Sequence, residues 1–284
     1  MKVARSIAEF HEFKRAIHDE RTVGFVPTMG ALHRGHLALV ASARRRCDLI
    51  VMSIFVNPLQ FGSSDDLDNY PRDETGDLAA AERSTVDVVF MPSVDEMYPA
   101  GESTTVDVGR LGSVVEGASR PGHFAGVATV VAKLFNIVRP DVAFFGQKDA
   151  QQVAVIEKMV SDLAWPVEID VVPTVRERDG LALSSRNALL TPDERARALV
   201  LSKALAAGRT QLESGGDLRS AEKAMLEVAA SEPAFDLDYA EVLDPVTFEE
   251  PTADGPVLLA IAGTIGNTRL IDNVLVDKTT AESA

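Results

Sequence analysis

Cysteine is nearly absent from this sequence: its 284 residues include only one, Cys47. A single thiol cannot form a disulfide within the chain, which excludes the class of small secreted proteins stabilised by disulfides. Cys47 follows three consecutive arginines at the end of an expected helix, and we interpret it as a structural thiol rather than a reactive one. The expected location is therefore a reducing compartment, the cytoplasm.

Long apolar segments are also missing. No uninterrupted apolar run approaches the length of a membrane span. Residues 1–13 carry Lys2, Arg5, Glu9 and Glu12 and lack the apolar centre of a secretion signal. We therefore expect a protein that is neither exported nor inserted into a membrane.

Basic residues are few, because 28 Lys and Arg face 43 Asp and Glu and give a formal net charge of −15. A field of this sign repels nucleic acids and anionic membrane surfaces. Neither is an expected partner. An anionic substrate would have to meet a locally positive site.

What remains is the composition of a globular enzyme, with 46% hydrophobic and 25% charged residues and no internal repeat. Expected strands lie at 22–27, 49–56, 86–91, 142–145 and 167–172, and expected helices at 6–18, 37–47, 77–83, 122–138 and 150–163. Their alternation predicts an open parallel α/β sheet with helices on both faces.

The pattern changes after about residue 174. A loop at 176–187 precedes two helices rich in Ala, Leu and Glu, and expected strands follow at 238–243, 256–265 and 268–276. This order predicts a smaller α+β domain, so we expect one domain at 1–174 and a second at 175–284. The tail, residues 278–284, is expected to be disordered.

Residues 27–36 (PTMGALHRGH) join a buried strand to a helix, at the sheet edge where parallel α/β proteins bind ligands. His33 and His36 are three residues apart, so both project from one face of the first helical turn, where backbone N–H groups favour an anion. Gly35 lets the chain approach a ligand closely. Capping or surface histidines are the alternative, and a metal site lacks a third ligand at a suitable spacing.

The H-x-G-H turn resembles the HIGH signature of the nucleotidylyl-transferase superfamily, and the longer motif resembles the pantothenate synthetase family. Further strings that resemble this family, in its order, are 54–61 (IFVNPLQF), 69–72 (NYPR), 120–124 (RPGHF), 144–149 (FFGQKD) and 183–187 (LSSRN). These six strings are spread over residues 27–187, and their number and their order make the resemblance highly specific. It implies a Rossmann-like N-terminal domain, a C-terminal domain acting as lid, and a homodimer.

The resemblance also implies a reaction, the ATP-dependent condensation of pantoate with β-alanine. Pantoate would become pantoyl adenylate with release of pyrophosphate, and β-alanine would then displace AMP. ATP is thus an expected substrate, accompanied by Mg²⁺. Such a reaction needs no covalent enzyme intermediate, so positioning and charge stabilisation should supply most of the catalysis.

Four residues are predicted to act in catalysis: His33 and His36 on the phosphates, Lys148 as a positive charge in the same crevice, and Arg186 on the β- and γ-phosphates. Residues 184–186 resemble the mobile KMSKS loop, although the stretch also fits an interdomain linker. Asp149 fits the ribose hydroxyls or the N-cap of the next helix equally well. The residues predicted to bind ATP are Met29, His33, His36, Gly146, Lys148, Asp149, Ser184, Ser185 and Arg186.

The pantoate site is predicted around the amides of Gln60 and Gln152, with Met29, Phe55 and Val131 as apolar walls. Spacing alone would make Gln152 a surface residue of its helix. The resemblance places it in the site.

Asp77 is the predicted magnesium ligand, direct or through water, because the acidic pair common in the family reads Gly76-Asp77 here. Two other departures are Arg34, where an acid is common, and Ala150, where an aromatic is common. Neither departure removes a predicted catalytic group.

Two alternative functions remain open. A nucleotidylyl-transferase that moves AMP or CMP onto a phosphorylated acceptor also uses H-x-G-H. The neutral side chains of Gln60 and Gln152 argue against this function, because binding an acceptor phosphate calls for more cations. A nonenzymatic nucleotide-binding regulator would explain the histidines and the fold, but not the lid loop. A histidine-dependent metallohydrolase fails on ligand count.

Overall fold

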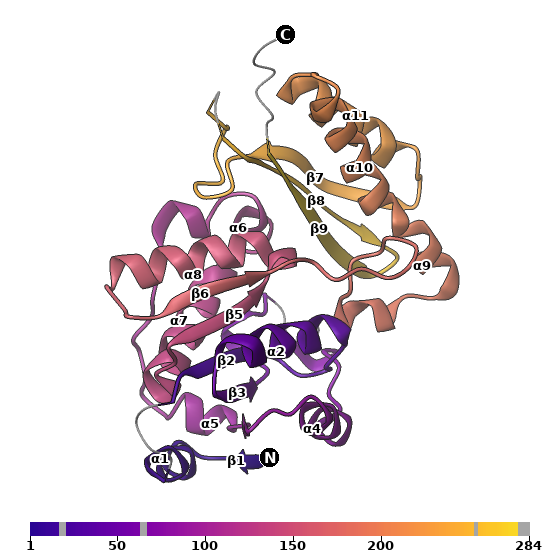
Figure 1. The fold of residues 1–284 in the computed structure, drawn as a ribbon. Helices are drawn as coiled ribbons and strands as arrows, with labels where there is room; N and C mark the ends of the chain where they lie inside the picture. The colour runs from indigo at the N-terminus through magenta and orange to yellow at the C-terminus, as the bar shows by residue number, and fades with distance from the viewer. Residues whose placement is uncertain (17–20, 63–66, 253–254, 278–284) are drawn as a thin grey trace.

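The computed structural model describes residues 1–16, 21–62, 67–252 and 255–277, and its larger sheet has six parallel strands (Figure 1). The strands are β1 (Lys2–Ala4), β2 (Val23–Thr28), β3 (Leu49–Ile54), β4 (Val88–Phe90), β5 (Val142–Gly146) and β6 (Glu168–Val172). They lie in the order β1-β4-β3-β2-β5-β6. All six residues of β3 are buried, as expected for a strand covered on both faces. The predicted parallel α/β sheet is confirmed.

Helices cover both faces of this sheet, because alternate residues of a strand point in opposite directions. Phe25 of β2 packs with the apolar residues of α7 and α8, whereas Val26 packs with those of α2 and α4. Cys47 lies in the second of these cores, where burial raises the pKa of its thiol. The helices are α1 (Ile7–Arg15), α2 (Arg34–Arg46), α4 (Glu74–Arg83), α5 (Val94–Met97), α6 (Glu116–Ser119), α7 (His123–Val138) and α8 (Ala150–Asp162).

The strand order reverses at β2, since β3 and β4 are added on one side of it and β5 and β6 on the other. Along β2, all six residues pair with β3, but only Gly24 and Phe25 pair with β5. The carboxyl ends of β2 and β5 therefore diverge. This is the position at which open α/β sheets bind ligands.

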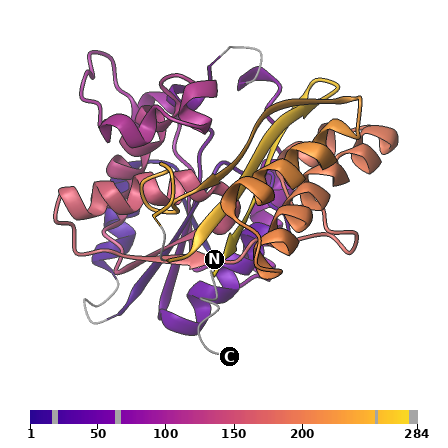
Figure 2. The ribbon, with the colours of Figure 1, turned by 90° about the horizontal axis from the view of Figure 1, so that it is seen from above.

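A second sheet follows, antiparallel and three-stranded, formed by β7 (Phe235–Leu243), β8 (Val257–Ile265) and β9 (Thr268–Val276). Leu259 of β8 packs with α10 (Leu199–Glu213) and α11 (Leu218–Ala230), whereas Leu258 joins the core of the larger unit. Figures 1 and 2 show α10 and α11 on the side of this sheet away from the parallel sheet. A short α9 (Pro192–Arg197) precedes them. The division of the chain at residue 174 stays a prediction.

Several element boundaries differ from those predicted. Helix α2 begins at Arg34 rather than near residue 37, because the His33 side chain caps it. Helix α4 begins at Glu74 rather than Asp77, because Asp73 caps it. Apolar spacing cannot reveal such caps, nor the short elements β1, α5 and α6.

Two predicted features lie outside the described residues: the end of the first helix at 17–18 and the tail at 278–284. Within the described ranges, no helix is long and apolar enough to cross a membrane.

Candidate functional site

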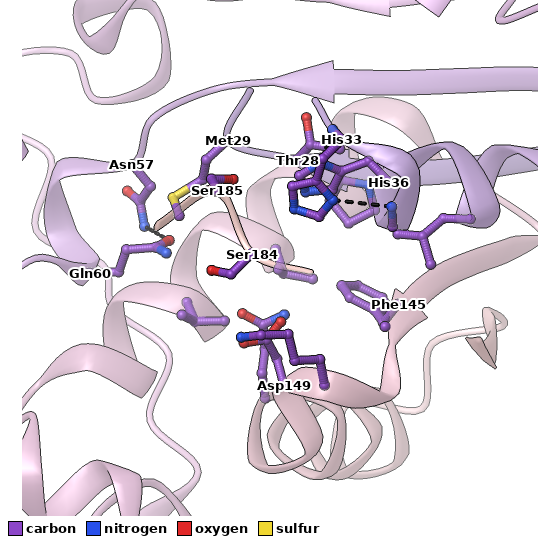
Figure 3. Close-up of a pocket in the computed structure, with 18 of the residues that line it drawn as sticks. Thr28, Met29, His33, His36, Asn57, Gln60, Phe145, Asp149, Ser184 and Ser185 are labelled. Atoms are coloured by element: carbon purple, nitrogen blue, oxygen red, sulfur yellow. Dashed lines mark hydrogen bonds between the residues drawn. The ribbon is translucent and has the colours of Figure 1, made fainter. Parts of the chain in front are cut away.

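A cavity of about 230 Å³ lies between the diverging ends of β2 and β5 (Figure 3). Its walls come from the turn after β2, the 3₁₀ helix η1 (Pro58–Gln60), the start of α7, the loop after β5 and residues 173–175 and 183–186. The residues predicted to bind ATP or pantoate all line it: Met29, His33, His36, Gln60, Gly146, Lys148, Asp149, Gln152, Ser184, Ser185 and Arg186. Phe55 and Val131, the predicted apolar walls, line it too. Their individual roles stay predictions.

His33 and His36 fix each other's orientation at the start of α2. His33 Nδ1 accepts a hydrogen bond from the Gly35 N–H at 3.1 Å, and His36 Nδ1 accepts one from the His33 N–H at 3.3 Å. The rings stack with their centroids 4.0 Å apart. Because both Nδ1 atoms act as acceptors, each neutral ring carries its proton on Nε2. The histidines are thus capping residues whose Nε2–H groups remain available as donors.

Both imidazoles are neutral at neutral pH. Burial, reinforced by the Lys148 charge, lowers the pKa of His33 to about 4. Burial, followed by the neighbouring His33 and Lys148, lowers the pKa of His36 to about 3. The rings therefore offer hydrogen bonds rather than charge, and the positive charge among the residues that line the cavity comes from Lys148, Arg186 and Arg120.

Asp77 lies behind the turn that follows β2 and does not line the cavity. It is only 4% exposed, and its carboxylate accepts hydrogen bonds from the Ala31 N–H at 2.9 Å and the Leu32 N–H at 2.7 Å. A Cβ at Gly30, where φ is +84°, would lie 2.8 Å from its Oδ2. Asp77 thus supports the H-x-G-H turn, with each carboxylate oxygen bound to a backbone N–H group.

This geometry does not support direct ligation of magnesium by Asp77, and the predicted role, as a ligand either directly or through water, stays a prediction. A metal-binding carboxylate presents its oxygens to the ion, and Mg²⁺ requires a nearly ideal octahedral arrangement around it. Within the described part of the chain, no group of three or more His, Cys, Asp or Glu side chains could hold a metal ion.

Lys148 and Asp149 stand at the end of β5, in the 3₁₀ turn η3 (Gln147–Asp149). The Asp149 side chain makes no capping hydrogen bond to α8, although the residue occupies the N-cap position. The capping alternative for this carboxylate is therefore not supported. Among the residues described, the Lys148 ammonium has no hydrogen-bond or ion-pair partner, which leaves its charge to the cavity.

Strand β9 of the antiparallel sheet holds the loop that carries Lys148. Asn273 of β9 donates hydrogen bonds from Nδ2 to the carbonyl oxygens of Gln147 at 3.0 Å and Lys148 at 2.8 Å. Beside it, Asp272 forms a two-point ion pair with Arg176 at 2.6 and 2.9 Å. Such a bidentate pair fixes geometry as well as contributing energy. Strand β9 thus contributes to the placement of a residue of the cavity.

Residues 184–186 lie against the H-x-G-H turn at the start of the 3₁₀ helix η4 (Ser185–Leu189). The Ser184 hydroxyl oxygen accepts a hydrogen bond from the Arg186 N–H at 3.2 Å. The Ser185 hydroxyl donates to the Ala31 carbonyl oxygen at 3.5 Å. The loop predicted to close over a triphosphate therefore lines the same cavity as the two histidines.

Two neighbouring glutamines of α8 have different environments. Gln151 is 5% exposed and bonds to backbone groups of Glu116, Leu111 and Val114. Gln152 is half-buried and lines the cavity. Successive helix positions point about 100° apart, which explains how one becomes structural and the other faces the cavity.

Among the polar residues that line the cavity without having been predicted as site residues are Asn57, Tyr70, Arg120 and His123. Each belongs to one of the sequence strings that carried the family resemblance, so the signal was present in the sequence. His123 Nδ1 lies 2.8 Å from the Gln60 carbonyl oxygen, and burial lowers the pKa of this imidazole to about 4. A neutral ring with its proton on Nδ1 donates to that carbonyl.

Comparisons with known proteins agree with this geometry. A sequence profile described as pantoate-β-alanine ligase matches residues 2–275. The pantothenate synthetase of Heliobacterium modesticaldum is 53% identical over 281 residues, which cover 98% of this chain and 100% of that protein.

Two solved structures are similar over nearly the full length. The pantothenate synthetase of Thermus thermophilus is 49% identical, with a TM-score of 0.92 over 96% of this chain and 99% of that one. The pantoate-β-alanine ligase of Francisella tularensis, solved in complex with β-γ ATP and β-alanine, is 34% identical, with a TM-score of 0.82 over all of both chains. On sequence and structure alike, this chain belongs to the pantoate-β-alanine ligase family.

Proposed function

We propose that this chain condenses pantoate with β-alanine at the expense of ATP, through pantoyl adenylate, with release of pyrophosphate and AMP. The observation that carries the proposal is the chemistry gathered in one cavity: two neutral imidazole donors, the cations Lys148 and Arg186, and the amides Gln60 and Gln152 beside apolar walls. A triphosphate needs the imidazole donors and the cations. A hydroxylated acid with a gem-dimethyl group needs the amides and the apolar walls.

In the first step a carboxylate oxygen of pantoate attacks the α-phosphorus of ATP. The new O–P bond forms as the bond to pyrophosphate breaks, and negative charge grows on the departing phosphates. The Nε2–H groups of His33 and His36 and the Lys148 ammonium would stabilise that charge without reorganising. The reacting groups are held together, which removes the entropic cost of a bimolecular encounter.

In the second step the neutral amine of β-alanine attacks the carbonyl carbon of pantoyl adenylate. A C–N bond forms, the C–O bond to AMP breaks, and the nitrogen loses a proton. The chain's part is to hold the adenylate and exclude water that would hydrolyse it. The complex of the Francisella tularensis relative with β-γ ATP and β-alanine supports a site that admits both.

Further roles are part of the same proposal. Asp149 would accept hydrogen bonds from the ribose, and Met29, Gly146, Ser184 and Ser185 would contact the nucleotide. Residues 175–284 would serve as lid, with Arg186 on the β- and γ-phosphates. Mg²⁺ would enter with ATP, bound to its phosphates. A homodimer and a cytoplasmic location remain predictions.

Pyrophosphate exchange tests the proposal. With pantoate present and β-alanine absent, the first step is reversible alone, so labelled pyrophosphate should enter ATP. Omitting pantoate should abolish the exchange. Exchange that required β-alanine, or that ignored pantoate, would reject a free pantoyl-adenylate intermediate.

A further inference from the structure

We propose that Tyr98, which does not line the cavity, is a positioning residue that acts through Asn57 and determines which end of the Gln60 amide meets the acid substrate. The inference rests on the proposed function only in naming that acid as pantoate. Tyr98 follows α5, and its hydroxyl donates a hydrogen bond to Asn57 Oδ1 at 2.7 Å.

The orientation of the Asn57 amide follows from the backbone groups around it. Asn57 is 1% exposed; its Nδ2 faces the Gly126 carbonyl oxygen at 3.1 Å, and its Oδ1 faces the Leu59 N–H at 3.3 Å. A backbone carbonyl only accepts and a backbone N–H only donates. Turning the amide over would place donor against donor and acceptor against acceptor. The assignment of nitrogen and oxygen at Asn57 is therefore set by groups of fixed polarity.

Tyr98 strengthens this orientation without itself lining the cavity. Because Asn57 Oδ1 carries no proton, the Tyr98 hydroxyl must be the donor in the 2.7 Å contact. The phenol ring packs on Phe55 with centroids 6.1 Å apart, and the Lys133 ammonium lies 5.2 Å from its centre. Burial raises the pKa of Tyr98, so the hydroxyl keeps its proton at any physiological pH.

Gln60 inherits its polarity from Asn57. Asn57 Nδ2 donates to Gln60 Oε1 at 3.0 Å, as drawn in Figure 3, so the Gln60 Nε2 group is the one left for a ligand. Two contacts restrain the main chain of Gln60 against a compensating shift. His123 holds its carbonyl oxygen, and Gly126 packs so closely that a Cβ there would overlap the Leu59 carbonyl oxygen.

The site therefore presents an N–H donor at this position and selects an acid with an acceptor oxygen there. A buried donor without a partner keeps the cost of its lost hydration uncompensated, which is the basis for rejecting an acid that lacks the oxygen. Pantoate supplies such oxygens in its hydroxyls and carboxylate. Tyr98 sets this selectivity without touching the substrate.

The substitution Tyr98→Phe tests the inference, because it keeps the ring and removes only the donor to Asn57. We expect the pantoate KM to rise about five- to tenfold, with the KM for ATP within about twofold of wild type. Preference for pantoate over analogues lacking one hydroxyl should fall by a similar factor. Lys133→Met, which leaves the Tyr98 hydroxyl in place, is the matched control and should change neither quantity.

A second variant reverses the polarity. In Asn57→Asp the carboxylate can only accept, so Gln60 must turn Nε2 toward it and present Oε1 to the substrate; the pantoate KM should rise on the order of 10²-fold. Unchanged pantoate KM and selectivity in Tyr98→Phe, or equal rises for pantoate and ATP, would overturn the inference. Wild-type exchange that ignored pantoate would instead reject the proposed function, so the two failures are distinguishable.

Discussion

Replacing Lys148 by methionine should lower kcat/KM by about 10²- to 10³-fold, the loss typical for removing one group that stabilises transition-state charge. The side chain lies in the cavity beside the histidines, and its ammonium has no ion-pair partner among the described residues. Its charge is therefore available to the phosphates. The change should leave the melting temperature nearly unaltered, since no contact within the described parts of the fold depends on that ammonium. Pyrophosphate release at varied ATP and pantoate measures the effect.

Lys158→Met is the matched control for this experiment. Lys158 lies on α8, the helix that follows Lys148, and its only partner among the described residues is Asp162, with which it forms an exposed ion pair at 2.8 Å. Its loss should leave kcat/KM within about twofold of wild type, because exposed pairs of this kind contribute little. A Lys148→Met enzyme as active as this control would show that Lys148 has no catalytic role.

The second large effect is expected at His36, where the chemical form of the ring can be tested directly. His36→Leu should lower kcat/KM by about 10²-fold or more, because it removes the Nε2–H donor from the part of the cavity where we propose that the phosphates bind. His36→Gln keeps an N–H donor at a similar reach without any possibility of positive charge. Since burial holds the ring neutral, with a pKa of about 3, the glutamine variant should retain clearly more activity than the leucine variant.

Steady-state kinetics and thermal unfolding of both His36 variants separate the possible outcomes. Equal inactivity with an unchanged melting temperature would mean that the imidazole does more than donate a hydrogen bond. Full activity in His36→Leu would reduce the residue to its capping contact with His33.

The parallel sheet and part of the cavity lining could be predicted because local patterns determine them. The buried runs of β2 and β3 are readable as strands, and the H-x-G-H turn follows β2 directly in sequence. Strand ends of a parallel sheet meet at one edge, so motifs far apart in the chain could be placed together. Gln152 and Lys148 were predicted to lie in the site by this argument and by family resemblance.

Contacts between distant segments could not be predicted, because nothing local in the sequence signals them. Asp77 was selected from the place that an acidic residue has in the family. In the structure its oxygens bind the N–H groups of Ala31 and Leu32, more than 40 residues earlier. Asn273 holds the Lys148 loop across 125 residues of sequence. Nothing in the sequence around Tyr98 indicates that the fold brings its hydroxyl to Asn57.

The central claim is that pantoate is activated as an acyl adenylate, and an oxygen-transfer measurement tests it most directly. Pantoate labelled with ¹⁸O in its carboxylate is turned over with ATP and β-alanine, and the AMP, pyrophosphate and any orthophosphate are analysed by mass spectrometry. Attack of the carboxylate on the α-phosphorus predicts that one labelled oxygen appears in AMP and none in pyrophosphate. Label in orthophosphate, with ADP as the nucleotide product, would contradict the account, because it would mean that an acyl phosphate forms instead.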